Sequence, residues 1–400
     1  MLRKSGGKAK VVCLVVLLAA AVLLATTTVL GSAAKLPPIK IGAAGPYTGD
    51  VSKIGLDGLN AIKMAVDEAN AAGGIGGRMI EIVEADDAGD PSKAILVAEK
   101  LAMDRAVIGV VGPMNSATVQ AALPTYQRVG LPIISQSATY PNLTEMGYKV
   151  MHRICPRDDA QGPASARFIA EALQAKTVYI IDDKTTYGQG LSDQVEPALK
   201  AAGVEVLRGQ IAIEDRDFSP ILTRVKASAP DLVYLGLANP AQAASLIKQA
   251  AGLGLQPTFM GGDGLKEKDQ LITGAAGLAE GMYVTSIGKD IREVPEAQEF
   301  IEKFESKYGA MSVFGGQSYE VANILIDAAR RAASDPMKIT RANVQEALGK
   351  TSSYTGILGF PIGFDGKGDV VGASIFVYQV KDGNFLLVEE YPATITISGQ

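Results

Sequence analysis

The chain has 400 residues, of which 47% are hydrophobic and 20% are charged. This length fits about two domains, and the ordinary composition excludes a disordered or fibrous protein. The formal net charge of −5 argues against nucleic acid or an anionic membrane as a partner.

The first 34 residues have the pattern of a signal peptide. Four cations within the first ten residues precede an apolar run over residues 11–25, and small residues follow at positions 31 to 34. We therefore expect cleavage and export to the periplasm. The alternative is an uncleaved anchor, since about 20 apolar residues can span a bilayer. Loss of the four cations would lower the formal charge from −5 to −9.

Strands and helices are expected to alternate along the rest of the chain, with Gly and Pro turns between them. Apolar runs predict strands at residues 40–44, 79–83, 107–111, 150–154, 178–182 and 205–211. Apolar positions about 3.6 residues apart predict helices at 56–72, 91–103, 160–174, 188–202, 218–227, 296–308, 317–333 and 341–348. The tail is predicted as strand and hairpin, with residues 364–369 as the turn.

One stretch of the chain is repeated. Residues 107–139 match residues 231–263 after a shift of 124 positions, so that Gly112 falls on Gly236 and Thr139 on Asp263. Each copy contains an apolar run, a glycine turn, a helical period and a second apolar run. Short apolar runs without polar alternation are typical of parallel sheets covered by helices on both faces. The expected fold is therefore α/β, with two doubly wound open-sheet lobes.

Ligands of such sheets bind outside the carboxyl ends of the strands. The first copy places hydroxyl groups there and the second an acid, so facing lobes would bracket a small ligand with opposite kinds of group. The candidate residues are Ser116, Ser137, Thr139, Tyr187 and Asp263. Ser116 could instead be a helix N-cap, and Asp263 a turn aspartate.

Most catalytic and metal chemistry lacks the residues it needs. Cys13 lies in the expected signal peptide, so Cys155 has no disulfide partner, and His152 is the single histidine and is expected to be structural. Gly-x-Ser-x-Gly, His-Glu-x-x-His, Gly-x-Gly-x-x-Gly after a strand and Walker motifs do not occur in the sequence. We expect no enzyme activity, no metal and no cofactor.

Two stretches have alternative interpretations. The glycines of residues 73–77 could cradle a phosphate, but they precede a strand and no Lys-Ser/Thr follows. Asp365 and Asp369 could bind calcium, but Lys367 stands between them and a distal Glu is missing. A tight reversal and a hairpin turn are the favoured interpretations.

Five stretches carry a resemblance to a known family. They are residues 39–50 (IKIGAAGPYTGD), 70–77 (NAAGGIGG), 86–91 (DDAGDP), 183–190 (DKTTYGQG) and 259–264 (FMGGDG). Together they resemble the exported leucine/isoleucine/valine-binding receptors of amino-acid ABC importers, which are type I periplasmic binding proteins. The resemblance covers the chain from about residue 38 onward. It implies lobes of residues 35–156 with 288–362 and of 157–287 with 363–400, joined by three crossovers.

The resemblance also implies roles for the candidate residues. Ser116 and Thr139, with the main chain of Ser137, would hold the carboxylate of an amino acid. Asp263, where leucine-binding members have Glu, would bind the ammonium group. Tyr187 would close on the ligand from the second lobe.

Departures from the family pattern lie around the ligand side chain. Phe314 would line the side-chain pocket, but Ile54 and Ala238 stand where the family has aromatic residues. Gly89 and Asn115 stand where those members have a disulfide, so that bond is missing. The binding of an amino acid is thus better supported than a preference for branched side chains.

The expected function is a monomeric periplasmic receptor that closes around a small, branched-chain-like amino acid and delivers it to a membrane permease. A receptor for an amide, urea or an aromatic acid is the nearest alternative. An enzyme on a doubly wound fold is less favoured, because nucleophile, base and cofactor signatures are missing. A transcriptional regulator shares the lobes, but an export signal and the lack of a basic DNA-reading helix argue against it.

Overall fold

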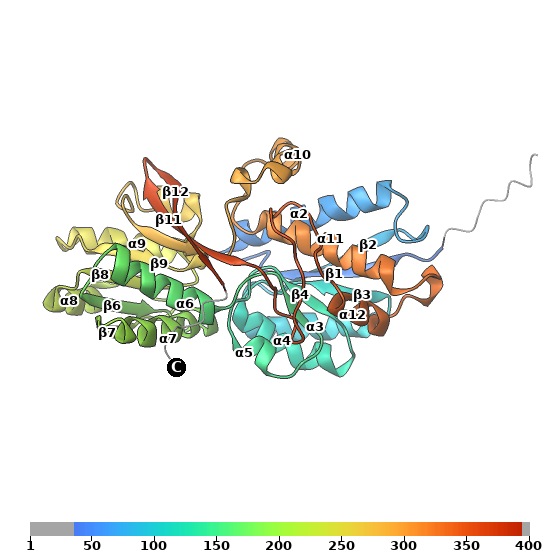
Figure 1. Ribbon diagram of the computed structural model, residues 1–400, viewed down its shortest axis with the longest axis horizontal. Helices are drawn as coiled ribbons and strands as arrows, with labels where there is room; N and C mark the ends of the chain where they lie inside the picture. The colour runs from blue at the N-terminus through green and yellow to red at the C-terminus, as the bar shows by residue number, and fades with distance from the viewer. Residues whose placement is uncertain (1–35, 394–400) are drawn as a thin grey trace, which may run out of the picture. The chain divides into compact units, whose positions relative to one another are not determined.

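The computed structural model describes residues 36–393, which form two lobes, each built on one sheet (Figure 1). The first sheet has five strands in the order β2-β1-β3-β4-β5, all parallel. The second has seven strands in the order β12-β11-β10-β9-β8-β6-β7, and only the pairs that include β11 are antiparallel. The expected signal peptide lies outside the described residues. No helix within residues 36–393 has the length and apolar character that a membrane crossing requires.

The first lobe contains nine elements from the first part of the chain and three later helices. They are β1 (Ile39–Gly45), α2 (Ser52–Ala71), β2 (Ile80–Asp86), α3 (Pro91–Met103), β3 (Val107–Val111), α4 (Ser116–Arg128), β4 (Ile133–Ser135), α5 (Asn142–Glu145), β5 (Met151–Arg153), α10 (Gln298–Tyr308), α11 (Gly315–Ala332) and α12 (Arg341–Gly349).

The second lobe follows the same alternation and ends in a hairpin. Its elements are α6 (Asp158–Arg167), β6 (Thr177–Asp182), α7 (Thr186–Ala201), β7 (Glu205–Gln210), α8 (Ser219–Ser228), β8 (Leu232–Gly236), α9 (Pro240–Gly252), β9 (Thr258–Gly261), β10 (Tyr283–Ser286), β11 (Ser374–Lys381) and β12 (Asn384–Pro392). A π-helical segment, Phe168–Ala172, extends α6.

Each sheet is covered on both faces because successive strand residues point to opposite sides. In the first lobe, Ile41 packs in a core with α2 and α11, whereas Val110 packs with α3 and α4. In the second lobe, Ile181 packs with α8 and α9, whereas Ile180 packs with α6 and α7. The doubly wound fold predicted from uninterrupted apolar runs is confirmed.

The predicted repeat corresponds to β3-α4-β4 and β8-α9-β9, and α4 and α9 each have 13 residues. Their first residues, Ser116 and Pro240, are separated by the predicted shift of 124 positions. The two units put the loops that follow β4 and β9 in equivalent places, so Thr139 and Asp263 occupy matching positions in different lobes.

A glycine ends β3 and lets the chain turn toward the site. Gly112 has φ +96°, and a Cβ there would lie 2.1 Å from the carbonyl oxygen of Ala44. We expect Gly112→Ala to lower the free energy of unfolding by at least ~2 kcal/mol in urea denaturation, because it adds a clash to backbone strain. Gly130→Ala is the control, since Gly130 has φ +62° but open space around it; its loss should be near ~1 kcal/mol. Equal losses would contradict the clash.

The turn of the C-terminal hairpin was predicted at the wrong place. β11 and β12 are joined at Asp382 and Gly383, whereas residues 364–369 form a smaller turn that closes an isolated bridge between Phe364 and Val370. The two long strands that pair as a hairpin, β11 and β12, flank the second Asp-Gly, which is why that dipeptide makes the hairpin turn.

The lobe limits proposed from the sequence stay a prediction. Phe364 and Val370 pack against the core of the first lobe, and β11 begins at Ser374 in the second sheet. We therefore propose that the third crossover occupies residues 371–373.

Candidate functional site

The candidate residues lie at the carboxyl ends of parallel strands. Ser116 begins α4 just after β3, and Ser137 and Thr139 follow β4. In the second lobe, Tyr187 lies in the first turn of α7 after β6, and Asp263 follows β9. This is the edge at which open α/β sheets bind their ligands.

One pocket brings together six of the seven candidates, which are Ile54, Ser116, Ser137, Tyr187, Asp263 and Phe314. Its other lining residues are Val51, Met114, Asn115, Ala238 and Gly264. The cavity volume is about 50 Å³, and one water molecule needs ~10–15 Å³ of such volume. The pocket is therefore small, and both lobes contribute to its wall.

The acidic side of the pocket is built around Asp263, which is 2% exposed. Its Oδ1 accepts hydrogen bonds from the hydroxyl of Tyr187 at 2.8 Å and from Nε2 of Gln161 at 2.9 Å. The backbone N–H of Asp263 donates to Oε1 of Gln161 at 3.1 Å, and Thr285 donates to the same oxygen at 2.7 Å. These bonds fix the carboxylate without supplying a positive charge.

A second buried carboxylate, Asp158, lies behind the first. It is fully buried at the start of α6, and its Oδ1 accepts from the same Nε2 of Gln161 at 3.1 Å. Within the described residues, Oδ2 of Asp158 has no hydrogen-bond partner. Two carboxylates thus share one amide donor.

Burial raises the pKa of both acids. Desolvation raises the pKa of Asp263 to about 6, although the hydrogen bonds from Gln161 and Tyr187 oppose the shift. Desolvation and the nearby charge of Asp263 raise the pKa of Asp158 to about 8. Like charges so close cannot both ionise cheaply, so burial and mutual repulsion both favour the protonated form of these acids. A cationic group bound beside Asp263 would favour the ionised carboxylates and lower the pKa of both acids.

The opposite side of the pocket is the amino terminus of α4. The N-cap of this helix is Asn115, not Ser116 as the alternative interpretation had it, and the Asn115 side chain makes no capping hydrogen bond. Ser116 Oγ accepts from the N–H of Tyr140 at 3.3 Å, and Ser137 Oγ donates to the carbonyl of Met114 at 3.1 Å. Helix N–H groups without a cap, beside hydroxyl groups, form a site for an anion.

The equivalent helix of the second lobe is closed to an anion. At the start of α9, Oδ1 of Asn239 accepts from the N–H groups of Ala241 at 2.9 Å and Gln242 at 3.2 Å. Pro240 has no N–H to donate. Of the two repeated helices, therefore, only α4 presents uncapped N–H groups to the pocket.

Thr139 is the candidate that does not line the pocket. It is fully buried, and its Oγ1 has no hydrogen-bond partner among residues 36–393. Its carbonyl accepts from the N–H of Asp158 at 3.0 Å. Thr139 thus lies beside the second acid, behind the pocket wall.

The remaining wall is apolar and suits a hydrocarbon side chain. Ile54, Met114 and Phe314 pack in one cluster that also includes Tyr187. Phe314 has φ +70°, an unusual conformation for a bulky residue, and it also borders a larger neighbouring cavity of about 510 Å³. Phe314 therefore limits the pocket on that side.

Sequence reasoning missed Asp158 and Gln161 as site residues. They stand three positions apart at the start of a helix, which puts both on one face, and that spacing directly after a predicted crossover was an available signal. The hydrogen bond from Gln161 to Asp263 joins residues 102 positions apart, so no local sequence pattern predicts it.

Three further features noted in the sequence, His152, Cys155 and the Gly89/Asn115 positions, lie outside the lining of the small pocket except for Asn115. His152 is buried, packs edge-on to Phe364 at 5.0 Å, and desolvation lowers its pKa to about 4. Cys155 is buried and unpaired, and burial raises the pKa of its thiol. A Cβ on Gly89 would lie 3.9 Å from Oδ1 of Asn115, so the two positions for which the resemblance implied a disulfide pair are adjacent here.

Comparison with known proteins identifies the family. Residues 38–384 match the family model described as periplasmic binding protein. An "Amino acid binding protein" of Pseudomonas aeruginosa is 35% identical, over 88% of this chain and 92% of its own. The "Leucine-, isoleucine-, valine-, threonine-, and alanine-binding protein" of the same organism is 34% identical, over 85% of this chain and 89% of its own.

Among solved structures, the branched-chain amino acid transporter substrate-binding protein of Streptococcus pneumoniae, in complex with isoleucine, has a TM-score of 0.79 and 27% identity. The match covers 89% of this chain and 99% of that one. With a two-lobed α/β fold and a pocket between lobes, this chain belongs to the periplasmic binding proteins, in the leucine/isoleucine/valine-binding family of amino-acid ABC importers.

Proposed function

We propose that this protein is the exported receptor of an ABC importer and that it binds a small amino acid by closing its two lobes. The observation that carries the proposal is the arrangement of opposite groups around one pocket. The uncapped amino terminus of α4, with Ser116 and Ser137, lies on one side. The buried acids Asp263 and Asp158 lie on the other side, where both accept a hydrogen bond from Nε2 of Gln161.

A zwitterion matches this arrangement at each end. Its carboxylate would accept hydrogen bonds from Ser116 and from main-chain N–H groups around α4 and Ser137. Its ammonium would lie against Asp263, with the buried carboxyl group of Asp158 behind it. Charge-assisted hydrogen bonds contribute ~1.5–3 kcal/mol each, so a few of them suffice for micromolar binding at about −8 kcal/mol.

The ligand side chain would lie against Ile54, Met114 and Phe314. The relatives are named for leucine, isoleucine, valine, threonine and alanine, and one solved structure contains isoleucine. The apolar wall supports the same class of small aliphatic side chains here.

Polar contacts between the two lobes support lobe closure. Asp50 of the first lobe accepts from Nδ2 of Asn239 at 3.3 Å and pairs with Arg216 at 3.4 Å. Gln270 donates to the carbonyl of Asp50 at 3.1 Å. The contacts of Arg216 and Gln270 are exposed and therefore weak. A ligand that touches both lobes would add to them and favour the closed state.

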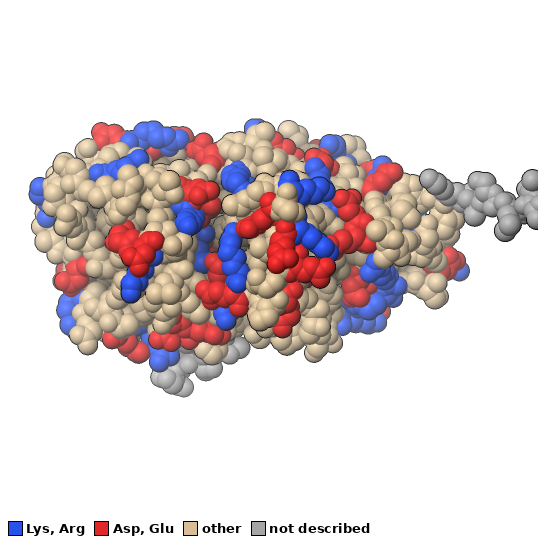
Figure 2. Space-filling view, turned by 90° about the horizontal axis from the view of Figure 1, so that it is seen from above, with Lys and Arg blue, Asp and Glu red and all other residues tan. Residues whose placement is uncertain are grey.

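The location and partners follow from the same proposal. Residues 1–34 would direct export to the periplasm, where the closed monomer would dock on a membrane permease. On the face shown in Figure 2, acidic and basic side chains are interspersed, with no broad basic patch for nucleic acid. The family consists of binding proteins, and we propose no enzyme activity.

A thermal-shift screen of the mature chain tests the function. Small aliphatic amino acids should raise the melting temperature, because a ligand at 100 times its dissociation constant adds ~2.7 kcal/mol to the free energy of unfolding. The matched amides, which keep the ammonium but lose the carboxylate, should give smaller shifts, and so should the deaminated acids. Stabilisation by amides, urea or benzoate but not by amino acids would contradict the proposal.

A further inference from the structure

A buried arginine holds the loop that carries two of the candidate ligand residues. Arg153 is fully buried at the end of β5. Its Nη1 donates to the carbonyl of Ala138 at 2.9 Å and to that of Tyr140 at 2.8 Å. Its Nη2 donates to Oγ1 of Thr144 at 2.7 Å. The loop from Ser137 to Tyr140 is therefore fixed from below by one guanidinium group.

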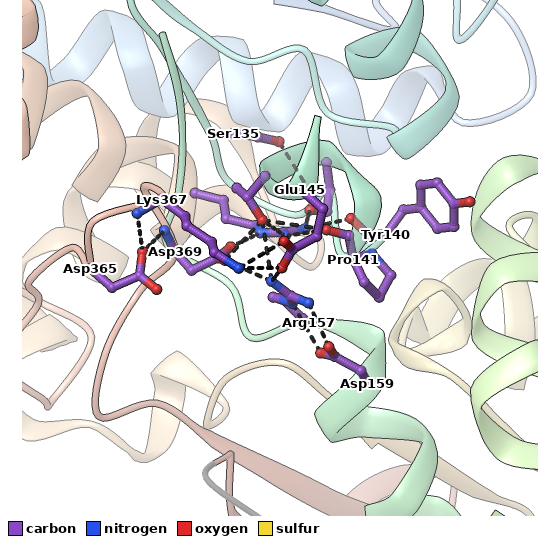
Figure 3. A network of polar contacts seen from close by, with 12 residues as sticks. Ser135, Tyr140, Pro141, Glu145, Arg157, Asp159, Asp365, Lys367 and Asp369 are labelled. Atoms are coloured by element: carbon purple, nitrogen blue, oxygen red, sulfur yellow. Dashed lines mark hydrogen bonds and ion pairs between the residues drawn. The ribbon is translucent and has the colours of Figure 1, made fainter. Parts of the chain in front are cut away.

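The counterion of this arginine comes from a distant part of the chain. Oδ1 of Asp369 lies 2.5 Å from Nε of Arg153, and Oδ2 accepts from Thr144 at 2.8 Å and from Arg157 at 3.0 Å (Figure 3). The N–H of Arg153 also donates to the carbonyl of Gly368 at 3.0 Å. Although burial opposes it, the charge of Arg153 lowers the pKa of Asp369. The carboxylate considered for calcium is thus engaged by two arginines.

This ion pair joins three segments that the ligand site depends on. The first is the loop of Ser137 and Thr139. The second is the crossover that leads from Arg153 to Asp158, whose N–H donates to the carbonyl of Thr139 at 3.0 Å. The third is the turn that contains Asp369, just ahead of the third crossover.

The outer part of the same network is exposed and contributes less. Arg157 pairs with Glu145 at 2.8 Å, and Lys367 pairs with Glu145 at 2.7 Å. The side chains of Glu145, Arg157 and Lys367 lie near Asp369 in Figure 3 but make no hydrogen bond to the carbonyl groups of Ala138 and Tyr140. Exposed pairs of this kind have small energies, so the positioning effect belongs to the inner pair.

We propose that Asp369 and Arg153 are positioning residues for amino-acid binding. Together they fix the loop from Ser137 to Tyr140 relative to the first crossover, which leads from Arg153 to Asp158. The inference rests on the proposed function. Asp369 and Arg153 differ in this from an ordinary structural ion pair, because replacing either residue should lower ligand affinity as well as stability. Asp369 keeps the guanidinium oriented so that its donors reach both loop carbonyls.

Calorimetry with the amino acid that gives the largest thermal shift tests the inference. Asp369→Asn should bind it at least tenfold more weakly than the wild type, at a temperature at which both are fully folded by circular dichroism. Arg208→Met is the matched control, since Arg208 joins Asp182, Asp193 and Glu196 in the second lobe. Arg208→Met should have a lower melting temperature but bind the amino acid with unchanged affinity. Lys367→Ala should also bind it with unchanged affinity.

A double variant separates positioning from stability. In Arg153→Met/Asp369→Leu the buried charges are replaced by apolar groups, which restores packing but leaves the carbonyls of Ala138 and Tyr140 without their donor. We expect a folded protein with affinity still at least tenfold below the wild type. Wild-type affinity in this variant or in Asp369→Asn would overturn the inference. A wild type that binds no amino acid would overturn the receptor proposal, and this inference with it.

Discussion

Replacing Asp263 with Ala should weaken amino-acid binding by at least tenfold. The carboxylate is the buried acid that lines the pocket directly, and a charge-assisted hydrogen bond to an ammonium group is worth ~1.5–3 kcal/mol, or about 10-fold to 150-fold in the dissociation constant. Asp263→Asn keeps the size of the side chain and should lose nearly as much. Isothermal calorimetry at pH 7 measures both losses.

The control for Asp263 is a carboxylate of the same lobe outside the small pocket. Asp269→Ala removes one negative charge from an exposed position six residues further on, and it should bind as the wild type does. If Asp263→Asn binds equally well, the ligand has no ammonium group at this position, and a receptor for an amide or an aromatic acid becomes the better proposal.

Asp158→Asn should make the empty protein more stable at pH 8 and yet weaken amino-acid binding. Burial raises the pKa of Asp158 to about 8 and that of Asp263 to about 6, above the values of ~4 expected in the unfolded chain. Between about pH 4 and pH 8 the folded protein therefore binds more protons than the unfolded one. The stability due to these acids is full below pH 4 and is lost as the pH rises toward 8.

Urea denaturation at several pH values measures this effect. The free energy of unfolding of the empty wild type should fall between pH 5 and pH 8, and Asp158→Asn should make the fall shallower. Asp87→Asn is the control, because Asp87 is also fully buried with its pKa raised by desolvation to about 6, but it follows β2 in the first lobe, where its Oδ1 accepts from the N–H of Gly89, and it shares no donor with Asp263. It should flatten the pH profile without changing affinity. Unchanged affinity in Asp158→Asn would show that the charge of this acid does not contribute to ligand binding.

Much of the fold could be predicted because its signals are local. The apolar runs of β3 and β8, and the glycines that follow them, mark the repeated unit without reference to the rest of the chain. Strand-end geometry then placed Ser116, Ser137, Tyr187 and Asp263 at one edge. For the turn of the hairpin, two Asp-Gly dipeptides were available, and the choice between them depended on which flanking strands pair.

The parts of the site that escaped prediction depend on contacts between distant residues. Gln161 meets Asp263 across 102 positions, and Arg153 meets Asp369 across 216. Nothing in the neighbourhood of Asp158 shows that a second acid will lie behind it. The position of Thr139 behind the pocket wall, beside that acid, likewise requires the packed structure.

The unequal ends of the two repeated helices have a consequence for how a ligand can enter. Duplicated units placed face to face would otherwise accept a head-and-tail molecule in either direction. Here Asn239 and Pro240 leave the amino terminus of α9 without free N–H groups for an anion, and Asp263 and Asp158 lie in the same lobe as that helix. The orientation of the proposed zwitterion in the pocket is thereby set whatever its side chain, because a reversed zwitterion would meet like charge at both ends.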